Sequence, residues 1–367
     1  MSTIDTETLR SWLEEGKPVT VLDIRSAADR ATWAIPGSLH VDAYAELKAH
    51  NPHALDGISL PADVPVVTVC NVGQVSQIAS EQLQARGIAA SSLEGGMRAW
   101  SLSWNTADVP LPGSKAQVIQ IRRVGKGCLS YLIGSEKEAV VIDASLEPEV
   151  YLNIARSHGW SITAVLDTHI HADHLSRSRL LAEQSGATVY LPNQERVTYA
   201  FTPLRNGAIV RVGEASLMVI QTPGHTAESM SYLLDRQALF TGDTLFLQGV
   251  GRPDLHATTE GTRSHAELLH HSLHHHLLLL PARTLVLPGH TNSPTPFDKI
   301  PLTATIGDLW KKVELLRLSE SEFVDALVAR IPPVPPNHEH IIELNEAGRW
   351  IENPIKLEAG ANNCGIS

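Results

Sequence analysis

Cysteine, long apolar runs and excess positive charge are all scarce in this sequence, and each scarcity narrows what the protein can be. The three cysteines, Cys70, Cys128 and Cys364, lie far apart and do not form the spacing pattern of a disulfide framework. No apolar run approaches the roughly 20 residues that a membrane-spanning helix needs. The first residues also lack the basic and then apolar plan of a signal peptide. We therefore expect a protein of the reducing cytoplasm with no membrane partner.

The charge balance is acidic. Lysine and arginine number 29 against 40 aspartates and glutamates, which gives a formal net charge of −11. Because nucleic-acid binding depends on a basic footprint, this balance argues against a nucleic-acid partner. The 367 residues favour two domains, and 43% hydrophobic residues are ample for their cores.

The most distinctive stretch is residues 168–176, Thr-His-Ile-His-Ala-Asp-His-Leu-Ser, which follows an apolar, β-branched run. Side chains two apart share a face of an extended chain, so we expect His169, His171 and Asp173 to point the same way. Imidazole and carboxylate ligands suit zinc or iron, and a structural zinc knuckle is disfavoured because the cluster has no thiolate. The alternative is a set of solvated loop histidines, but chance gives this pattern in roughly one such chain in several hundred.

Residues 70–76, Cys-Asn-Val-Gly-Gln-Val-Ser, come directly after the second of two apolar strands and open a predicted helix. This order places Cys70 under backbone N–H groups and at the positive end of the helix dipole. The setting favours a thiolate or a bound anion at Cys70.

Several segments resemble the rhodanese (sulfurtransferase) family, in the right order, over about residues 1–108. The matching segments are Val-Leu-Asp-Ile-Arg at 21–25, Ile-Pro-Gly at 35–37, the loop at 70–76, and Leu-Glu-Gly-Gly-Met-Arg-Ala-Trp at 93–100. The resemblance implies an α/β domain in which Cys70 takes up sulfane sulfur as a persulfide. Two positions depart from the family: Val75 replaces the usual arginine and Ala34 a frequent histidine. An anionic donor would then be held by backbone dipoles alone, and the alternative is an inert docking domain.

Residues 105–115 contain two prolines, a glycine and small polar residues, which is typical of an exposed linker. We place the rhodanese domain at 1–108 and the linker at 109–116. The second domain is predicted at 117–300.

Three more loops in the second domain carry polar signatures directly after predicted strands. They are Thr-Pro-Gly-His-Thr at 222–226, Thr-Gly-Asp-Thr at 241–244 and Leu-Pro-Gly-His-Thr at 287–291. One histidine after a strand is more often structural, but three such loops following the His-x-His-x-Asp-His stretch predict one metal site. Cys128 lies inside an apolar strand and is expected to be a buried, inert thiol.

This set of motifs resembles the metallo-β-lactamase superfamily over about residues 117–295, which implies an αββα sandwich with the loops on one edge. Two branches of that superfamily fit. Hydrolases of the glyoxalase II kind use two metals, and a metal-bound hydroxide attacks a thioester. Persulfide dioxygenases use one Fe(II) held by two histidines and one aspartate, which leaves open positions for a persulfide and O₂.

By motif match, the iron ligands would be His169, His225 and Asp243. The other polar residues would orient these ligands or hold a second metal; they are His171, Asp173, His174 and His290. Because every ligand of a two-metal site is present, the ligand set alone leaves one Fe(II) and two Zn(II) both open.

Three features favour the dioxygenase branch. Residues 248–254, Gln-Gly-Val-Gly-Arg-Pro-Asp, resemble the Gly-x-Gly-Arg-x-Asp segment of that branch. Arg252 and Asp254 match the arginine and the aspartate of that segment. They would either contact substrate or pair with each other to shape the loop. A fused rhodanese domain handles the sulfane sulfur that a persulfide carries. The chain also lacks an obvious glyoxalase-type glutathione-binding C-terminal domain.

The resemblance implies oxidation of a thiol persulfide by O₂ to sulfite and thiol. Glutathione persulfide is the default substrate, but Asn292 stands near a position where glutathione-using dioxygenases usually have tyrosine. The thiol carrier and the direction of sulfur transfer at Cys70 therefore stay open.

Residues 301–367 are predicted to form a helical extension, with one long helix over 306–331. Extra helices with exposed apolar stripes often serve subunit contact, so we expect a homo-oligomer. Six histidines between 265 and 276 lie in a predicted helix over 263–278 and are expected to be a partly solvated face, with metal binding as the alternative. Cys364 is expected to be a packed or exposed tail cysteine, with sulfur relay as the alternative.

Overall fold

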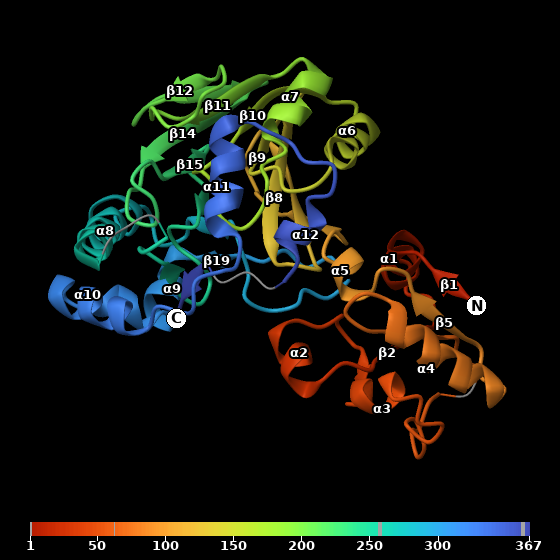
Figure 1. The fold of residues 1–367 in the computed structure, drawn as a ribbon. Helices are drawn as coiled ribbons and strands as arrows, with labels where there is room; N and C mark the ends of the chain where they lie inside the picture. The colour runs from red at the N-terminus through yellow and green to blue at the C-terminus, as the bar shows by residue number, and fades with distance from the viewer. Residues whose placement is uncertain (1, 62, 256–258, 361–363) are drawn as a thin grey trace.

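The first unit of the fold is a parallel sheet covered by helices on both faces. The computed structural model describes residues 2–61, 63–255, 259–360 and 364–367 (Figure 1). The strands of this sheet run in the order β1-β5-β4-β2-β3. They are β1 (Thr3–Ile4), β2 (Thr20–Asp23), β3 (Leu39–His40), β4 (Val66–Val69) and β5 (Ala90–Leu93). The helices are α1 (Thr6–Glu14), α2 (Ala27–Thr32), α3 (Tyr44–Lys48), α4 (Gln74–Ala85) and α5 (Gly96–Trp100).

Alternate residues of the central strands belong to different cores, because successive side chains of a strand point to opposite faces. Leu22 and Val66 pack with Leu83 of α4, whereas their neighbours Val21 and Val67 pack in the other cluster. Helices therefore cover both faces, and the predicted α/β rhodanese domain is confirmed.

The second unit contains two sheets packed face to face. The first sheet has the order β12-β11-β10-β9-β8-β7-β6 and the second β13-β14-β15-β16-β18-β19. The strands of the first sheet are β6 (Asn105–Val109), β7 (Gln117–Arg123), β8 (Cys128–Ser135), β9 (Glu138–Ile142), β10 (Ser161–Leu166), β11 (Thr188–Pro192) and β12 (Thr202–Leu204). Those of the second are β13 (Ile209–Val212), β14 (Ala215–Gln221), β15 (Met230–Leu234), β16 (Ala238–Gly242), β18 (Leu285–Pro288) and β19 (Ala304–Thr305).

Helices cover the outer faces of both sheets. Tyr131 of the first sheet and Phe240 of the second meet in the central core at a ring-centroid distance of 4.8 Å. Outside the first sheet lie α6 (Pro148–Ser157) and α7 (Ser178–Ser185), whose apolar residues share a second cluster with β7, β9 and β10. Outside the second sheet lies α8 (Thr259–Ser272), which continues as a π-helix over Leu273–Leu277. The predicted αββα sandwich is therefore confirmed.

The entry into the second domain differs from the prediction. Residues 105–109 form the edge strand β6, which pairs antiparallel with β7. Asn105, Ala107 and Val109 are buried and alternate with less buried neighbours, so this stretch is no exposed linker. The predicted boundary at residue 108 therefore cuts through a strand of the second sheet.

The C-terminal extension is also more broken than predicted. Instead of one helix over 306–331, the structure has α9 (Ile306–Lys312), a 3₁₀ turn at Glu314–Arg317 and α10 (Glu320–Ala329). Ser319 starts α10 with a capping box in which Glu322 is the reciprocal partner, and this local signal outweighs continuous helical periodicity. Two further helices follow, α11 (His338–Ala347) and α12 (Ile355–Glu358), and then β20 (Gly365–Ile366), which pairs with β17 (Val250–Gly251).

The apolar stripes of the extension pack within the chain. Phe323 and Leu327 of α10 join the cluster of α8, and Ile341 and Leu344 of α11 pack with Leu175. These apolar residues, whose expected exposure suggested a homo-oligomer, are buried within the chain, and the oligomer stays a prediction. Among the helices of the described residues, none is long and apolar enough to cross a membrane.

The histidine-rich segment is exposed only in part. His271 and His275 are exposed and stack at 4.4 Å between ring centroids, but His270 is buried against Phe323, at 5.3 Å. The histidines therefore form a partly solvated face, as predicted, with His270 on its buried side.

Candidate metal centre

The polar motifs meet at one edge of the sandwich because each follows a strand of one of the two sheets. The loop at 167–177 follows β10, His225 follows β14, Asp243 follows β16 and His290 follows β18. All the motif histidines and aspartates in these loops are at least 95% buried. The structure thus brings the predicted site residues together in a water-poor setting.

His169, His225 and Asp243 form a triad with free donor atoms at its centre. The Asp243 Oδ2 atom lies 3.9 Å from His169 Nε2 and 3.6 Å from His225 Nε2. His169 Nε2 and Asp243 Oδ2 are buried and find no hydrogen-bond partner among the described residues. Unpaired buried polar atoms are costly, and two imidazoles with one carboxylate are suitable ligands for a transition metal. The triad therefore fits a cation.

The two triad histidines are oriented through their other ring nitrogens. His225 Nδ1–H donates to the carbonyl of Arg252 at 2.7 Å. His169 Nδ1–H donates to Thr168 Oγ1 at 2.9 Å, because that hydroxyl already donates to Asp143. Such partners fix the tautomer and leave Nε2 as the lone-pair donor.

A second group of donor atoms lies beside the triad. His290 contacts Asp243 Oδ1 through Nδ1 at 2.6 Å and Asp173 Oδ2 through Nε2 at 3.1 Å. His174 Nδ1 lies 3.0 Å from Asp173 Oδ1, and the Cys128 thiol lies 3.3 Å from Asp173 Oδ2. Cys128, Asp173, His174 and His290 offer ligand atoms within 4.8 Å of one another, and this group could also hold a metal.

The ring of His171 lies 4.3 Å from that of His169 and 4.2 Å from that of His174, between centroids, but its nitrogens face other partners. Its Nε2 lies 3.3 Å from Asp143 Oδ1, and it groups with Asp143 and Asp167. The backbone bends at residues 168–169 and 172–174, so the extended-chain argument does not apply. His169, His171 and Asp173 lie close together but belong to three different groups of ligand atoms, so their predicted common face stays a prediction.

Buried charges set the protonation of the site. Burial disfavours charged His290, but the facing Asp243 and Asp173 carboxylates outweigh it and raise the pKa of His290 well above its usual value. Burial also opposes ionisation of Asp243, yet His290 holds the pKa of that carboxyl below its usual range. Burial and His171 lower the pKa of His169, which keeps the Nε2 lone pair of this histidine available.

Cys128 is a site residue that sequence reasoning placed among inert core thiols. Burial and Asp173 oppose its ionisation, but His174 and His290 outweigh them and lower the pKa of Cys128 to about 6. Cys128 begins β8 and forms an isolated β-bridge with His290. No local sequence signal could find it, because its partners come from distant loops.

Arg252 shapes the loop beyond Asp243. Its guanidinium pairs with both carboxylate oxygens of Asp254, each at 2.8 Å, and donates to the Pro332 carbonyl at 2.9 Å. The backbone N–H of Arg252 donates to the carbonyl of Cys364 at 2.9 Å. These contacts favour a loop-shaping role for Arg252 and Asp254 over substrate contact.

Cys364 also lies at the site and not in a loose tail. Cys364 is buried, and its sulfur lies within 4.8 Å of ligand atoms of Asp243 and His290. Burial raises the pKa of Cys364 well above its usual value. Cys364 reaches the site because β20, which directly follows it, pairs with β17, and local sequence does not indicate this pairing.

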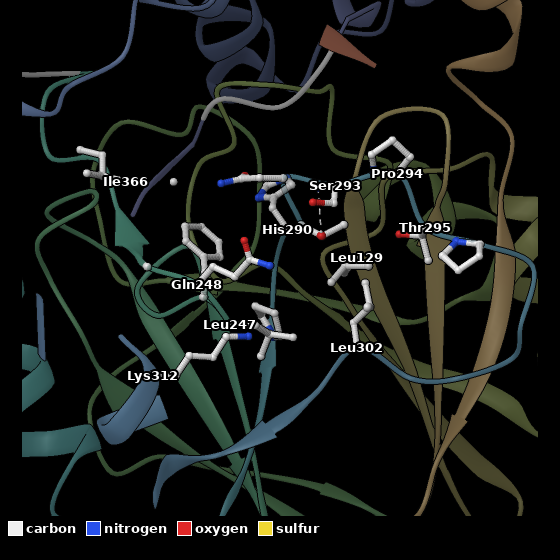
Figure 2. A pocket seen from close by; sticks show the side chains of 17 residues that line it. Leu129, Leu247, Gln248, His290, Ser293, Pro294, Thr295, Leu302, Lys312 and Ile366 are labelled. Atoms are coloured by element: carbon white, nitrogen blue, oxygen red, sulfur yellow. Dashed lines mark hydrogen bonds between the residues drawn. The ribbon is translucent and has the colours of Figure 1, made fainter. Parts of the chain in front are cut away.

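A cavity of about 170 Å³ opens beside the metal centre, and Figure 2 shows His290 among the side chains that line it. Leu129, Leu302 and Ile366 make apolar walls, and Lys312 and Asn292 supply polar groups. His290 therefore joins this cavity to the cluster of metal-site residues.

Cys70 occupies the predicted loop at the N-terminus of α4 and is fully buried. Its Sγ accepts from the backbone N–H of Gly73 at 3.1 Å and from Ser76 Oγ at 3.3 Å. A separate cavity beside the loop is lined by Asn71, Arg25 and Arg98, so cations lie near the loop although residues 70–76 contain none.

Comparison with known proteins agrees with this architecture. Residues 123–290 match the metallo-beta-lactamase superfamily and residues 5–103 match the rhodanese-like domain. A hydroxyacylglutathione hydrolase of Pseudomonas entomophila is 34% identical over 159 residues, 42% of this chain and 58% of that protein. The mitochondrial persulfide dioxygenase ETHE1 of Bos taurus is 31% identical over 170 residues, 45% of this chain and 65% of that protein. The chain thus spans less than two thirds of the length of either relative.

A solved structure extends the match. The crystal structure of ETHE1 from Myxococcus xanthus is 31% identical, with a TM-score of 0.54, over 66% of this chain and 99% of that one. The fold and the clustered site define a metal-binding enzyme of the αββα type. The chain belongs to the metallo-beta-lactamase superfamily and also carries a rhodanese-like domain. Hydrolase and dioxygenase relatives match at similar identity, so the likeness alone does not select the reaction.

Proposed function

We propose that the chain is a persulfide dioxygenase with one Fe(II), held by His169, His225 and Asp243. The observation that carries the proposal is the contrast between the two donor groups. The triad leaves His169 Nε2 and Asp243 Oδ2 buried without partners among the described residues, whereas both carboxylate oxygens of Asp173 and both nitrogens of His290 are already engaged. A single cation in the triad would pair with both of these buried atoms.

The proposed net reaction converts a persulfide RSSH, O₂ and water into sulfite, the thiol RSH and two protons, so the outer sulfur is oxidised and O₂ is reduced. When bound, Fe(II) supplies redox chemistry with O₂ and open coordination positions. The chain orients His225 through the Arg252 carbonyl and excludes bulk water by burial. The cavity beside His290 would admit the persulfide.

Oxygen uptake by the Fe(II)-reconstituted protein, with sulfite assayed in the same vessel, tests the proposal. With glutathione persulfide we expect one O₂ consumed for each sulfite formed. A second small persulfide assayed in parallel shows whether a lack of uptake reflects the wrong thiol carrier or the wrong reaction. Iron bound in stoichiometric amount without uptake on either substrate would contradict the proposal.

Replacing Asp243 with alanine removes the carboxylate that both triad histidines face. We expect Asp243→Ala to lose stoichiometric iron and oxygen uptake, measured as metal content after dialysis together with turnover. Asp325→Ala is a matched control, because this exposed carboxylate pairs with Arg263 at 2.8 Å on the surface. Retained iron and turnover in Asp243→Ala would refute the ligand assignment.

A second candidate is a two-metal thioester hydrolase. It is favoured by His174 Nε2, another buried atom without a hydrogen-bond partner among the described residues, next to Asp173 and His290. Zinc-reconstituted protein with two ions per chain that hydrolyses a glutathione thioester, and takes up no oxygen with iron, would support this candidate.

A further inference from the structure

The metal-binding loop lies between β10 and α7, outside the hydrogen-bond ladders of the sheets. Buried peptide groups in such a loop need partners from elsewhere. Several of these partners are side chains of the C-terminal extension, whose helices α11 and α12 are labelled in Figure 1.

Asn345 of α11 uses its whole amide on this loop. Its Nδ2 group donates to the carbonyl of His171 at 2.8 Å and to that of His174 at 2.9 Å. Its Oδ1 accepts from the backbone N–H of Ser176 at 2.9 Å. One side chain therefore sets the separation of three peptide groups within the motif.

Glu358 of α12 holds the residue between these contacts. The carboxylate is 1% exposed, and its Oε1 accepts from the backbone N–H of Leu175 at 2.8 Å. Arg123 donates to its Oε2 at 2.8 Å and Arg177 pairs with it as well, so both oxygens are fixed. A charge-paired carboxylate is a strong and rigid acceptor.

The extension also reaches the first part of the loop through an ion-pair chain. The backbone N–H of Ile170 donates to Glu228 Oε1 at 3.2 Å, and Arg196 links Glu228 to Glu346 of α11. Contacts at residues 170, 171, 174, 175 and 176 thus begin directly after His169 and span the stretch that carries Asp173 and His174.

We propose that Asn345 and Glu358 are positioning residues of the metal centre, which fix the loop backbone so that its histidines and aspartate present their donor atoms correctly. The C-terminal extension is then part of the metal site. This inference goes beyond the proposed reaction, because the same loop supplies ligands whether one iron or two zinc ions bind. Loss of groups that orient ligands typically weakens metal binding by about 10- to 100-fold.

The test is a cobalt(II) titration of the full-length apo-protein and of Asn345→Ala. We expect about 10- to 100-fold weaker cobalt binding by Asn345→Ala, together with a changed visible d–d spectrum. The spectrum separates positioning from a merely structural role, because loss of stability alone leaves the geometry around bound cobalt unchanged. Glu343→Ala is the matched control, since this exposed carboxylate of α11 faces His340 at 3.5 Å.

Asn345→Asp sharpens the test and serves if Asn345→Ala fails to fold. It keeps the shape and the acceptor for Ser176 but replaces the two N–H donors with an oxygen that faces the carbonyls of His171 and His174. We expect a loss of cobalt affinity at least as large as for Asn345→Ala. Wild-type affinity and spectrum in a folded Asn345 variant, or an equal loss in Glu343→Ala, would overturn the inference.

Cobalt binding needs no turnover, so this test is independent of the oxygen-uptake test. If the Asn345 variants bind cobalt as the wild type does, the proposed reaction still stands. If the reaction fails but the variants bind cobalt more weakly, the positioning role of Asn345 and Glu358 still stands. A wild-type chain that binds no cobalt would overturn both the metal site and the positioning role of Asn345 and Glu358.

Discussion

At the scale of single residues, the state of each histidine depends on what its second ring nitrogen contacts. His225 and His169 commit Nδ1 to a carbonyl and a hydroxyl, so Nε2 is left for a cation. His290 contacts a carboxylate through each of its nitrogens, which favours the charged form with one N–H toward each carboxylate. Identical side chains thus have different roles because of their partners.

Cys70 gives a prediction at the same scale. We expect Cys70→Ser to lose sulfur transfer from thiosulfate while oxygen uptake persists, because Cys70 lies in the rhodanese-like domain under the N-terminus of α4. Parallel sulfurtransferase and oxygen-uptake assays on the same protein check this expectation. If neither assay responds to the substitution, the domain serves docking and not transfer.

At the scale of elements, local signals explain both a success and an error. The polar motifs were predicted at strand ends because each lies next to its strand in the sequence. The long helix over 306–331 was wrong because apolar periodicity continues across Ser319, where the capping box starts α10. A strong cap therefore decides where this helix begins, even though the apolar pattern does not change.

The capping box can be tested directly. We expect Ser319→Ala to lower the free energy of unfolding by about 1 kcal/mol, because the start of α10 loses the hydroxyl that bonds the Glu322 carboxylate at 2.6 Å. Urea denaturation measures this change. Ser157→Ala on the exposed end of α6 is a control, because that hydroxyl donates to the Ile154 carbonyl and caps no helix start. An equal loss in both variants would contradict a specific role for the cap.

At the scale of the whole molecule, long-range contacts are what the sequence could not reveal. Cys128, Asn345, Glu358 and Cys364 all reach the metal loop or its ligands from distant parts of the chain. Each is a lone residue without a repeated pattern, so neither periodicity nor spacing marks it. The motif residues were predictable, whereas the groups that hold them in place were not.

The whole chain also has a predicted response to acid. Burial opposes ionisation of Glu358, but Arg177 and Arg123 outweigh it and lower its pKa to about 2, from an ordinary value of 4.5. Between these two pH values the unfolded chain binds more protons at this group than the folded chain does. The contribution of Glu358 to the free energy of unfolding is therefore full above about pH 4.5 and is lost as pH falls toward 2. The contribution is on the order of 3 kcal/mol.

Unfolding free energies measured from pH 5.5 to 3 check this expectation. We expect Glu358→Gln to be less stable at pH 5.5 and to depend less steeply on pH across this window than the wild type. Parallel pH profiles of the two proteins would contradict the assignment to Glu358.

The contacts of Asn345 and Glu358 also bear on how the protein is made. A ribosome synthesises residues 168–176 long before residues 345 and 358, which close around that loop. A nascent chain still lacking its last helices therefore displays the histidines without the groups that arrange them. We expect metal loading to follow the completion of synthesis, so that an unfinished chain does not trap the ion in a misformed site.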